Sequence, residues 1–291
     1  MWPLPLPWLP TCSCLPEDKA MPQIDLPTGV RMFYLDPNPQ GGEVVLLLHG
    51  LGSAGESWQL QFPALEGAGF RPLAPDIRGF GRSSYPGRWR IPEVVKDLKA
   101  LLDALSLPRT HVVGISMGGV LAQAFALAHP ERTHRLVLIN TFARLRPRSP
   151  AGWLYFLFRL VLVYTVGMEA QARTVSQRIF PDAPVARETL RRHILQANPC
   201  AYRAAMRALA LFNAYPRLSE IQAPTLVITG LADTTVDPKN QGELVQGIPQ
   251  ARWLRIAGAG HGLIATHPDI VNPALVAFLQ GKPLPTTEPQ G

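Results

Sequence analysis

A serine lies in a glycine-rich segment between a predicted strand and a predicted helix. Residues 114–118 read Gly-Ile-Ser-Met-Gly, so Ser116 stands in the pattern G-x-S-x-G. His111–Ile115 has the apolar pattern of a short strand, and Met117–Ala128 consists of strong helix formers. So tight a turn holds the Ser116 hydroxyl above the end of the strand, and the glycines on either side avoid clashes. We therefore predict that Ser116 is a nucleophile.

Two other interpretations of this segment stay open from the residues alone. The turn could simply pack a strand against a helix, or its backbone N–H groups could bind a phosphate. The segment has neither the G-x-G-x-x-G pattern of a dinucleotide site nor the lysine of a P-loop. These absences favour the nucleophile.

A serine hydroxyl reacts well only when a base removes its proton, so a histidine partner is expected. Of the seven histidines, His261 lies in the glycine-rich loop Gly258–Gly262, directly after the last predicted strand. We predict that His261 is the general base, and that His49, which also follows a strand, is structural. The other histidines are expected to be solvated: His111, His129, His134, His193 and His267.

A carboxylate must orient this histidine and stabilise its protonated form. Asp233 follows the predicted strand Thr225–Thr229, and Asp237 lies four residues further on. Either aspartate could instead cap a helix, a role that suits Asp237 well. Asp233 is the preferred acid, and Asp76, after another strand, is a third candidate.

Strands and helices alternate along most of the chain, which predicts an α/β fold with a mostly parallel central sheet flanked by helices. Ligands bind beyond the carboxyl ends of such strands, where Ser116, Asp233 and His261 all lie. The strands are expected at Val44–Leu48, Phe70–Ala74, His111–Ile115, Arg135–Ile139, Thr225–Thr229 and Trp253–Ile256, and the helices at Trp58–Ala68, Ile91–Leu105, Met117–Ala128, around Gly242–Gln246 and at Ile270–Leu279.

Residues 145–219 interrupt this alternation with helical patterning, several prolines and no clear strand. We expect them to form a helical cap inserted into an α/β core of residues 22–144 and 220–281. Residues 1–21 are expected to be a disordered tail or an unused upstream start, and residues 282–291 a loose tail.

The insertion contains the apolar run Trp153–Met168, which is interrupted by Arg159. A membrane-spanning helix needs about twenty residues with few or no charges, so no stable membrane span is expected. The run is predicted to form a buried or pocket-lining helix, with a lipid-facing surface as the alternative. Trp153, Phe156 and Phe212 are predicted to line a substrate pocket.

Most of the net charge of +7 lies in residues 145–219, which hold eleven arginines, no lysine and three acidic residues. No recognition motif accompanies this charge, so no nucleic-acid partner is expected.

Three cysteines without paired spacing predict neither a disulfide framework nor a metal site. The N-terminus is a poor secretory signal, which favours a cytoplasmic location. The sequence carries no signal of oligomeric state.

Five segments resemble motifs of the α/β-hydrolase fold superfamily, in the order in which that family carries them. They are Leu46–Trp58 (LLLHGLGSAGESW), Ala74–Ser83 (APDIRGFGRS), Gly114–Gly119 (GISMGG), Gly230–Asp233 (GLAD) and Gly258–Gly262 (GAGHG). The resemblance runs from about Val44 to Leu279, is weak in the insertion, and points to the serine esterase-like branch with a helical cap. It also implies that Asp76 braces its loop through Arg78.

This resemblance implies an oxyanion hole formed by the backbone N–H groups of Leu51 and Met117. It implies Asp233 as the acid, although Asp237 here occupies the position where the family usually has proline. The implied activity is that of a serine carboxylesterase, which cleaves short- to medium-chain esters through an acyl-enzyme on Ser116 and needs no cofactor or metal. The alternatives are a C–C bond hydrolase, a lactonase or a perhydrolase of the same fold, or a non-catalytic member that binds a small ligand.

Overall fold

The computed structural model describes residues 22–145 and 150–285, and for residues 151–153, 155, 156, 159, 160 and 162 it describes the backbone alone. At its centre lies an eight-stranded sheet in the order β1-β2-β4-β3-β5-β6-β7-β8. β1 and β2 pair antiparallel with their neighbours, and the strands from β4 to β8 pair in parallel. The predicted α/β fold with a mostly parallel sheet is confirmed. The strands are β1 Gln23–Asp25, β2 Arg31–Leu35, β3 Val44–Leu48, β4 Arg71–Pro75, β5 Thr110–Ile115, β6 Thr133–Ile139, β7 Thr225–Gly230 and β8 Arg252–Ile256.

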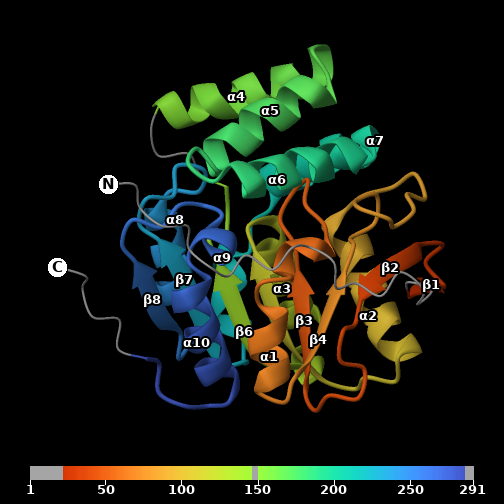
Figure 1. Ribbon diagram of the computed structural model, residues 1–291, viewed down its shortest axis with the longest axis vertical. Coiled ribbons are helices and arrows are strands. Elements are labelled where there is room, and N and C mark those ends of the chain that lie inside the picture. The colour runs from red at the N-terminus through yellow and green to blue at the C-terminus, as the bar shows by residue number, and fades with distance from the viewer. Residues whose placement is uncertain (1–21, 146–149, 286–291) are drawn as a thin grey trace, which may run out of the picture.

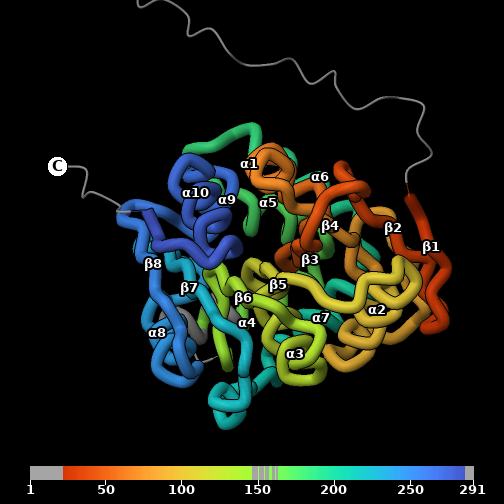
Figure 2. Tube along the Cα trace, turned by 90° about the horizontal axis from the view of Figure 1, so that it is seen from below, coloured from red at the N-terminus to blue at the C-terminus, as the bar shows by residue number. Residues whose placement is uncertain are grey.

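Helices cover both faces of the sheet because successive residues of each strand point to opposite sides. In β3, Leu46 and Leu48 pack into one apolar cluster, whereas Val45 and Leu47 pack into the other. Figure 2 shows α1, α9 and α10 over one face and α2, α3 and α8 over the other. These helices are α1 Phe62–Gly67, α2 Ile91–Ala104, α3 Met117–Ala128, α8 Pro238–Gly247, α9 Leu263–Thr266 and α10 Pro268–Leu279.

Between β6 and β7 the described chain is mostly helical, and Figure 1 shows its helices stacked beyond the ends of the strands, at the top of the molecule. They are α4 Pro150–Thr165, α5 Met168–Ile179, α6 Pro184–Gln196 and α7 Pro199–Leu211. The start of α7 is fixed by Pro199 and by the Asn198 side chain, which accepts hydrogen bonds from the backbone N–H groups of Cys200 and Ala201. Within the described parts of the chain, no helix has both the length and the apolar character needed to cross a membrane.

The expected helix at Trp58–Ala68 is two separate elements, a 3-10 turn at Gly55–Trp58 and α1. Pro63 lies in the first turn of α1 and has no N–H to bond to a preceding turn, which accounts for the start of a new helix there. The fully buried Gln61 side chain, just before α1, donates hydrogen bonds to the Ile264 carbonyl and to Asn272.

The expected contact between Asp76 and Arg78 is wrong. The Arg78 guanidinium pairs with Asp97 of α2, with Nη2 2.6 Å from Oδ1, and donates to the Arg88 carbonyl at 2.9 Å. Both partners of this ion pair are buried. Asp76 is left to bind backbone N–H groups, and Arg78 anchors its loop to α2, the next helix along the chain.

Replacement of Asp97 by alanine should destabilise the protein strongly, because it leaves the Arg78 charge buried without a counter-charge. We expect a loss of about 3–5 kcal/mol in the free energy of unfolding, measured by urea titration. The matched control is Asp103→Ala on the same helix, because Asp103 pairs with Lys99 and Arg132 at the surface. That change should cost about 1 kcal/mol or less. Equal losses at the two positions would contradict this role for Asp97.

Candidate active site

Ser116 lies between the end of β5 and the start of α3, where the backbone has very little space. A Cβ atom on Gly114 would collide with the Gly118 carbonyl, and one on Gly118 would collide with the Leu48 carbonyl oxygen. Ser116 itself has φ of 54°, in the region that L-residues avoid. The residues on either side are buried, whereas Ser116 is partly exposed. The turn therefore presents the serine side chain beyond the sheet.

His261 and Asp233 form a buried pair at the ends of β8 and β7. The His261 Nδ1 lies 2.8 Å from Asp233 Oδ2. The other oxygen, Oδ1, accepts hydrogen bonds from the backbone N–H groups of Thr235 at 2.7 Å and Val236 at 2.9 Å. A carboxylate only accepts hydrogen bonds, so Nδ1 carries the proton and Nε2 is left as the basic atom of the ring. Asp237 lies apart from this pair and caps α8 by accepting from the Lys239 N–H.

Asn140 and Thr141, directly after β6, connect the serine to the histidine loop. The buried Asn140 amide donates to the carbonyls of Gly260 at 2.9 Å and His261 at 3.0 Å, and its Oδ1 accepts from the Gly230 N–H at 2.8 Å. Thr141 donates its hydroxyl proton to the Ser116 carbonyl at 2.7 Å. Two adjacent residues thus hold the serine turn, the histidine loop and the end of the acid strand in fixed relative positions.

Neither of these positioning residues was predicted from the sequence. The available signal was a pair of polar side chains immediately after the apolar strand RLVLI, at the edge where the other candidates lie. Asn140 also has φ of 42°, a conformation that asparagine tolerates better than most residues.

The loop after β3 brings the backbone N–H of Leu51 towards the serine, while the N–H of Met117 directly follows Ser116 at the start of α3. A Cβ atom on Gly50 would lie 3.6 Å from Ser116 Cβ, so the loop passes close to the serine side chain. Among the described residues, no acceptor is found for the N–H groups of Leu51 and Met117. Their role as donors to a developing oxyanion stays a prediction.

His49 and Asp76 hold this loop in place. The fully buried His49 donates from Nδ1 to the Gly50 carbonyl at 2.8 Å and accepts at Nε2 from the Ile77 N–H at 3.0 Å. Burial lowers the pKa of His49 to about 4, so the ring is neutral at pH 7 and can accept that bond. Asp76 accepts from the N–H groups of Gly55 at 2.7 Å and Arg82 at 2.8 Å.

The insertion reaches the loops on both sides of the serine. A Cβ atom on Gly52 would lie 2.7 Å from Ile194 Cγ1 and 2.8 Å from Tyr202 Cε2, and one on Gly262 would collide with the Phe180 ring. Phe180, Ile194 and Tyr202 were not predicted, because sequence spacing gives no indication of which helix of the insertion faces the sheet.

The predicted pocket residues are only partly within the described structure. The side chains of Trp153 and Phe156 lie outside it. Phe212 is half-buried at the end of α7, where it packs against the apolar core.

A polar contact also joins the insertion to the core. The Glu56 carboxylate lies 3.2 Å from Nε2 of His193 on α6, and this hydrogen bond is the main cause of a lowered pKa for Glu56.

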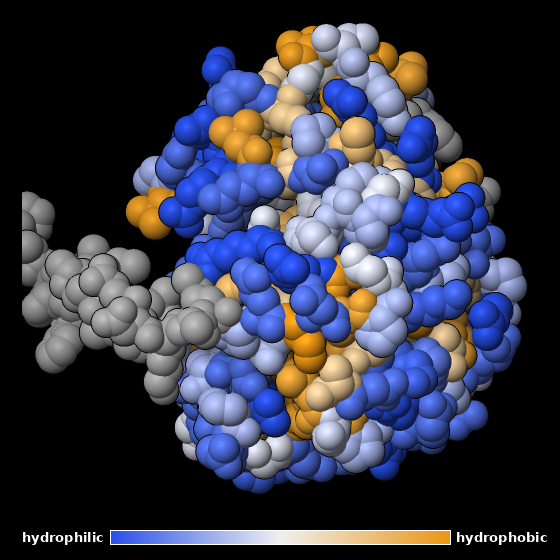
Figure 3. Space-filling model, turned by 90° about the vertical axis from the view of Figure 1, so that its right-hand side faces the viewer, coloured by the Kyte–Doolittle hydropathy of each residue, from blue (hydrophilic) through white to orange (hydrophobic). Residues whose placement is uncertain are grey.

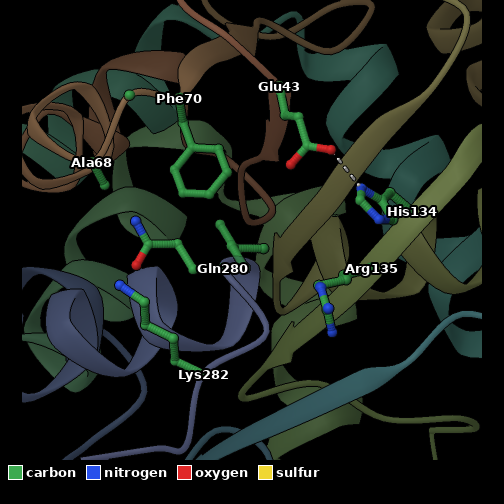
Figure 4. Close-up of a pocket in the computed structure, with 9 residues that line it drawn as sticks. Glu43, Ala68, Phe70, His134, Arg135, Gln280 and Lys282 are labelled. Atoms are coloured by element: carbon green, nitrogen blue, oxygen red, sulfur yellow. Dashed lines mark ion pairs between the residues drawn. The ribbon is translucent and has the colours of Figure 1, made fainter.

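A second polar cluster lies at the opposite end of the sheet, beside a cavity of about 500 Å³ that Figure 4 shows. Ligand-type atoms of Glu43, His111 and His134 lie within 4.8 Å of one another. His111 is buried, not solvated as expected, because it stacks on His134 and meets the edge of Phe70. His193, also expected to be solvated, is buried as well.

The surroundings of this cluster suit a hydrogen-bonded group better than a metal centre. A histidine that binds a metal normally donates its other ring N–H to an acceptor, but Nδ1 of His111 is buried without one among the described residues. Arg135 and Lys282 line the same cavity and disfavour a further cation. We therefore assign no metal to these residues.

Comparisons with known proteins agree with this architecture. Residues 43–268 match the family model described as the alpha/beta hydrolase fold. The RutD protein of Caulobacter vibrioides, a proposed carbamate hydrolase, is 32% identical over 250 residues, which cover 83% of this chain and 91% of that protein.

Two solved structures give the same result. The enol-lactonase of Burkholderia xenovorans LB400 superimposes with a TM-score of 0.80 and 30% identity, covering 89% of this chain and 100% of that one. A thermophilic esterase from Thermogutta terrifontis gives 0.78 and 29%, with coverage of 89% and 97%. The span matched by the family model, residues 43–268, includes the insertion.

Asn140→Asp should lower the free energy of unfolding more at high pH than at low pH. An ionised carboxylate at this position faces two carbonyl oxygens and cannot donate to them, whereas a protonated carboxyl can donate one hydrogen bond. The repulsion raises the pKa of the new carboxyl in the folded state. The folded variant therefore regains stability as pH falls, and we expect its deficit relative to wild type to shrink by about 1 kcal/mol or more between about pH 8 and about pH 5.

Urea unfolding at both pH values measures this deficit. The control is Asn213→Asp, because Asn213 is exposed and its deficit should stay nearly constant. A deficit at Asn140 that does not change with pH would contradict the contacts assigned to its amide.

Proposed function

This chain belongs to the α/β-hydrolase fold family, and we propose that it is a serine hydrolase that cleaves short- to medium-chain carboxylic esters. The buried pair of His261 and Asp233 carries this proposal, because it leaves Nε2 as a base with its ring orientation fixed. The strained turn at Ser116 and the linked contacts of Asn140 and Thr141 support it.

In the first step the Ser116 oxygen attacks the ester carbonyl carbon while His261 Nε2 accepts the hydroxyl proton. The carbonyl oxygen becomes an oxyanion, which the N–H groups of Leu51 and Met117 stabilise by roughly 3 kcal/mol each. The tetrahedral intermediate collapses when the C–O bond to the leaving group breaks. The alcohol departs with the proton from His261, and the acyl group stays on Ser116.

In the second step water attacks the acyl-enzyme and His261 accepts one of its protons. The second tetrahedral intermediate rests on the same two N–H groups. It collapses to release the acid, and the proton returns from His261 to the Ser116 oxygen. Asp233 stays ionised throughout and stabilises the imidazolium that forms in each step. Groups of this chain and water supply every step.

The relatives support an acyl substrate with a heteroatom leaving group. Their names cover an esterase, an enol-lactonase and a proposed carbamate hydrolase. A lactone is a cyclic ester, so the same nucleophile and oxyanion donors serve both. The apolar side chains that the insertion brings to the loops, Phe180 and Ile194 among them, favour an apolar acyl or alcohol group. We propose that Trp153, Phe156 and Phe212 also line the substrate pocket.

The proposal predicts that the protein hydrolyses p-nitrophenyl esters of short and medium chain length, with the rate measured by release of p-nitrophenol. Ser116→Ala should abolish the acyl-enzyme route and lower kcat by about 10⁵-fold or more, because no other hydroxyl occupies the turn. Retained turnover in this variant would contradict Ser116 as nucleophile. Wild-type protein that leaves the whole ester series intact would contradict the ester substrate.

The two aspartates after β7 should differ sharply in the same assay. Asp233→Asn removes the charge that fixes the histidine tautomer and should lower kcat by about 10³–10⁴-fold. Asp237→Asn serves as the matched control, because an asparagine caps a helix as well as an aspartate does, and kcat should change little. The reverse ranking would assign the acid to Asp237.

A further inference from the structure

The outermost helix of the insertion turns apolar side chains to solvent. Figure 1 shows α4 at the end of the molecule furthest from the sheet, and Figure 3 shows apolar groups exposed at that end among polar ones, as well as a larger apolar area lower on the same side. The exposed fraction is 69% at Leu154, 58% at Leu157 and 51% at Val161. On a soluble protein such side chains are normally scattered singly, so a group of them indicates a surface that contacts something.

These side chains form one stripe along the helix. The stripe consists of Leu154, Leu157, Phe158, Val161 and Tyr164. At about 100° per residue, these five side chains fall within an arc of about 120°. Val163 lies on the opposite face and is completely buried. Burial at Val163 therefore fixes the rotation of α4 and leaves the stripe outward.

Positive charge accompanies this stripe. The Arg203 guanidinium lies 5.3 Å from the centre of the Tyr164 ring, and its Nε donates to the Val163 carbonyl at 3.1 Å. Arg207 is exposed on α7 one turn further on. The sequence of residues 145–219 contains eleven arginines and three acidic residues. The stripe thus lies in a strongly basic segment.

We propose that the α4 stripe docks the protein on the anionic surface of a phospholipid bilayer. An apolar helix face beside basic residues is the composition of a helix that lies in the plane of the membrane interface. At 16 residues α4 is too short to span the bilayer but can insert its stripe below the headgroups, while the arginines contact lipid phosphates. A second copy fits less well, because a symmetric contact would bring the arginines of both copies together.

Co-sedimentation with vesicles tests the proposal, with full-length Ser116→Ala protein so that no lipid ester is cleaved. Vesicles of phosphatidylcholine alone are compared with an equal mixture of phosphatidylcholine and phosphatidylserine. We expect the partition coefficient to be about tenfold or more higher for the mixture, and to fall as salt screens the arginines.

A stripe variant and a matched control separate docking from general stickiness. Leu157→Gln with Phe158→Gln keeps helix propensity and should lower the partition coefficient about tenfold. Leu60→Gln with Val185→Gln changes two exposed apolar residues elsewhere and should leave it within about twofold. Thermal melting verifies that both variants are folded.

Three results would overturn the proposal. The first is absence of binding to the mixed vesicles, and the second is equal binding by the stripe variant. The third is a concentration-dependent dimer in sedimentation equilibrium that the stripe substitutions dissociate, which would assign the face to a second copy. None of these results depends on ester hydrolysis, so failure here leaves the proposed function standing.

Discussion

The close approach of β5, α3 and β3 around Ser116 is the constraint on which the rest of the site depends. Gly114 and Gly118 leave room for backbone but not for a Cβ atom, and Ser116 adopts a strained backbone conformation with φ of 54° and ψ of −116°. Such a conformation costs roughly 1–2 kcal/mol and persists only when its surroundings hold it. The Ser116 N–H donates to the Ile139 carbonyl at 3.0 Å, and its own carbonyl accepts from Thr141. Residues at the end of β6 therefore hold the strained Ser116 turn in place.

The same strand positions the base. Asn140 follows Ile139 directly, and its amide reaches both the His261 loop and the end of β7, three residues before Asp233. The serine turn, the base and the acid come from three different parts of the chain, yet all three are tied to two adjacent residues. Because these bonds are buried, water does not compete for them, and the relative positions are fixed before any substrate binds.

The strands and the positions of the candidate residues were easier to predict than the side chains that hold them in place. The strands, the parallel sheet and the order of Ser116, Asp233 and His261 follow from local patterns of apolar and turn residues. Asn140 carries no such pattern, because its partners lie about 90 and 120 residues away and only the strand order brings them together. The Arg78–Asp97 pair was missed for a different reason, because the family resemblance assigned Arg78 to the nearer Asp76 and nothing in α2 marks Asp97 as its partner. His111 and His193 were expected to be solvated, since helical and strand spacing does not reveal which neighbours cover a polar ring.

Covalent labelling with an alkyl fluorophosphonate tests the central claim most directly, because the Ser116 oxygen must attack phosphorus and expel fluoride. Intact-mass and peptide mass spectrometry would locate the adduct. The account predicts one adduct, on Ser116, whose rate of formation falls by orders of magnitude in His261→Ala protein. An unlabelled protein, an adduct on a different residue, or labelling that is equally fast without His261 would contradict it.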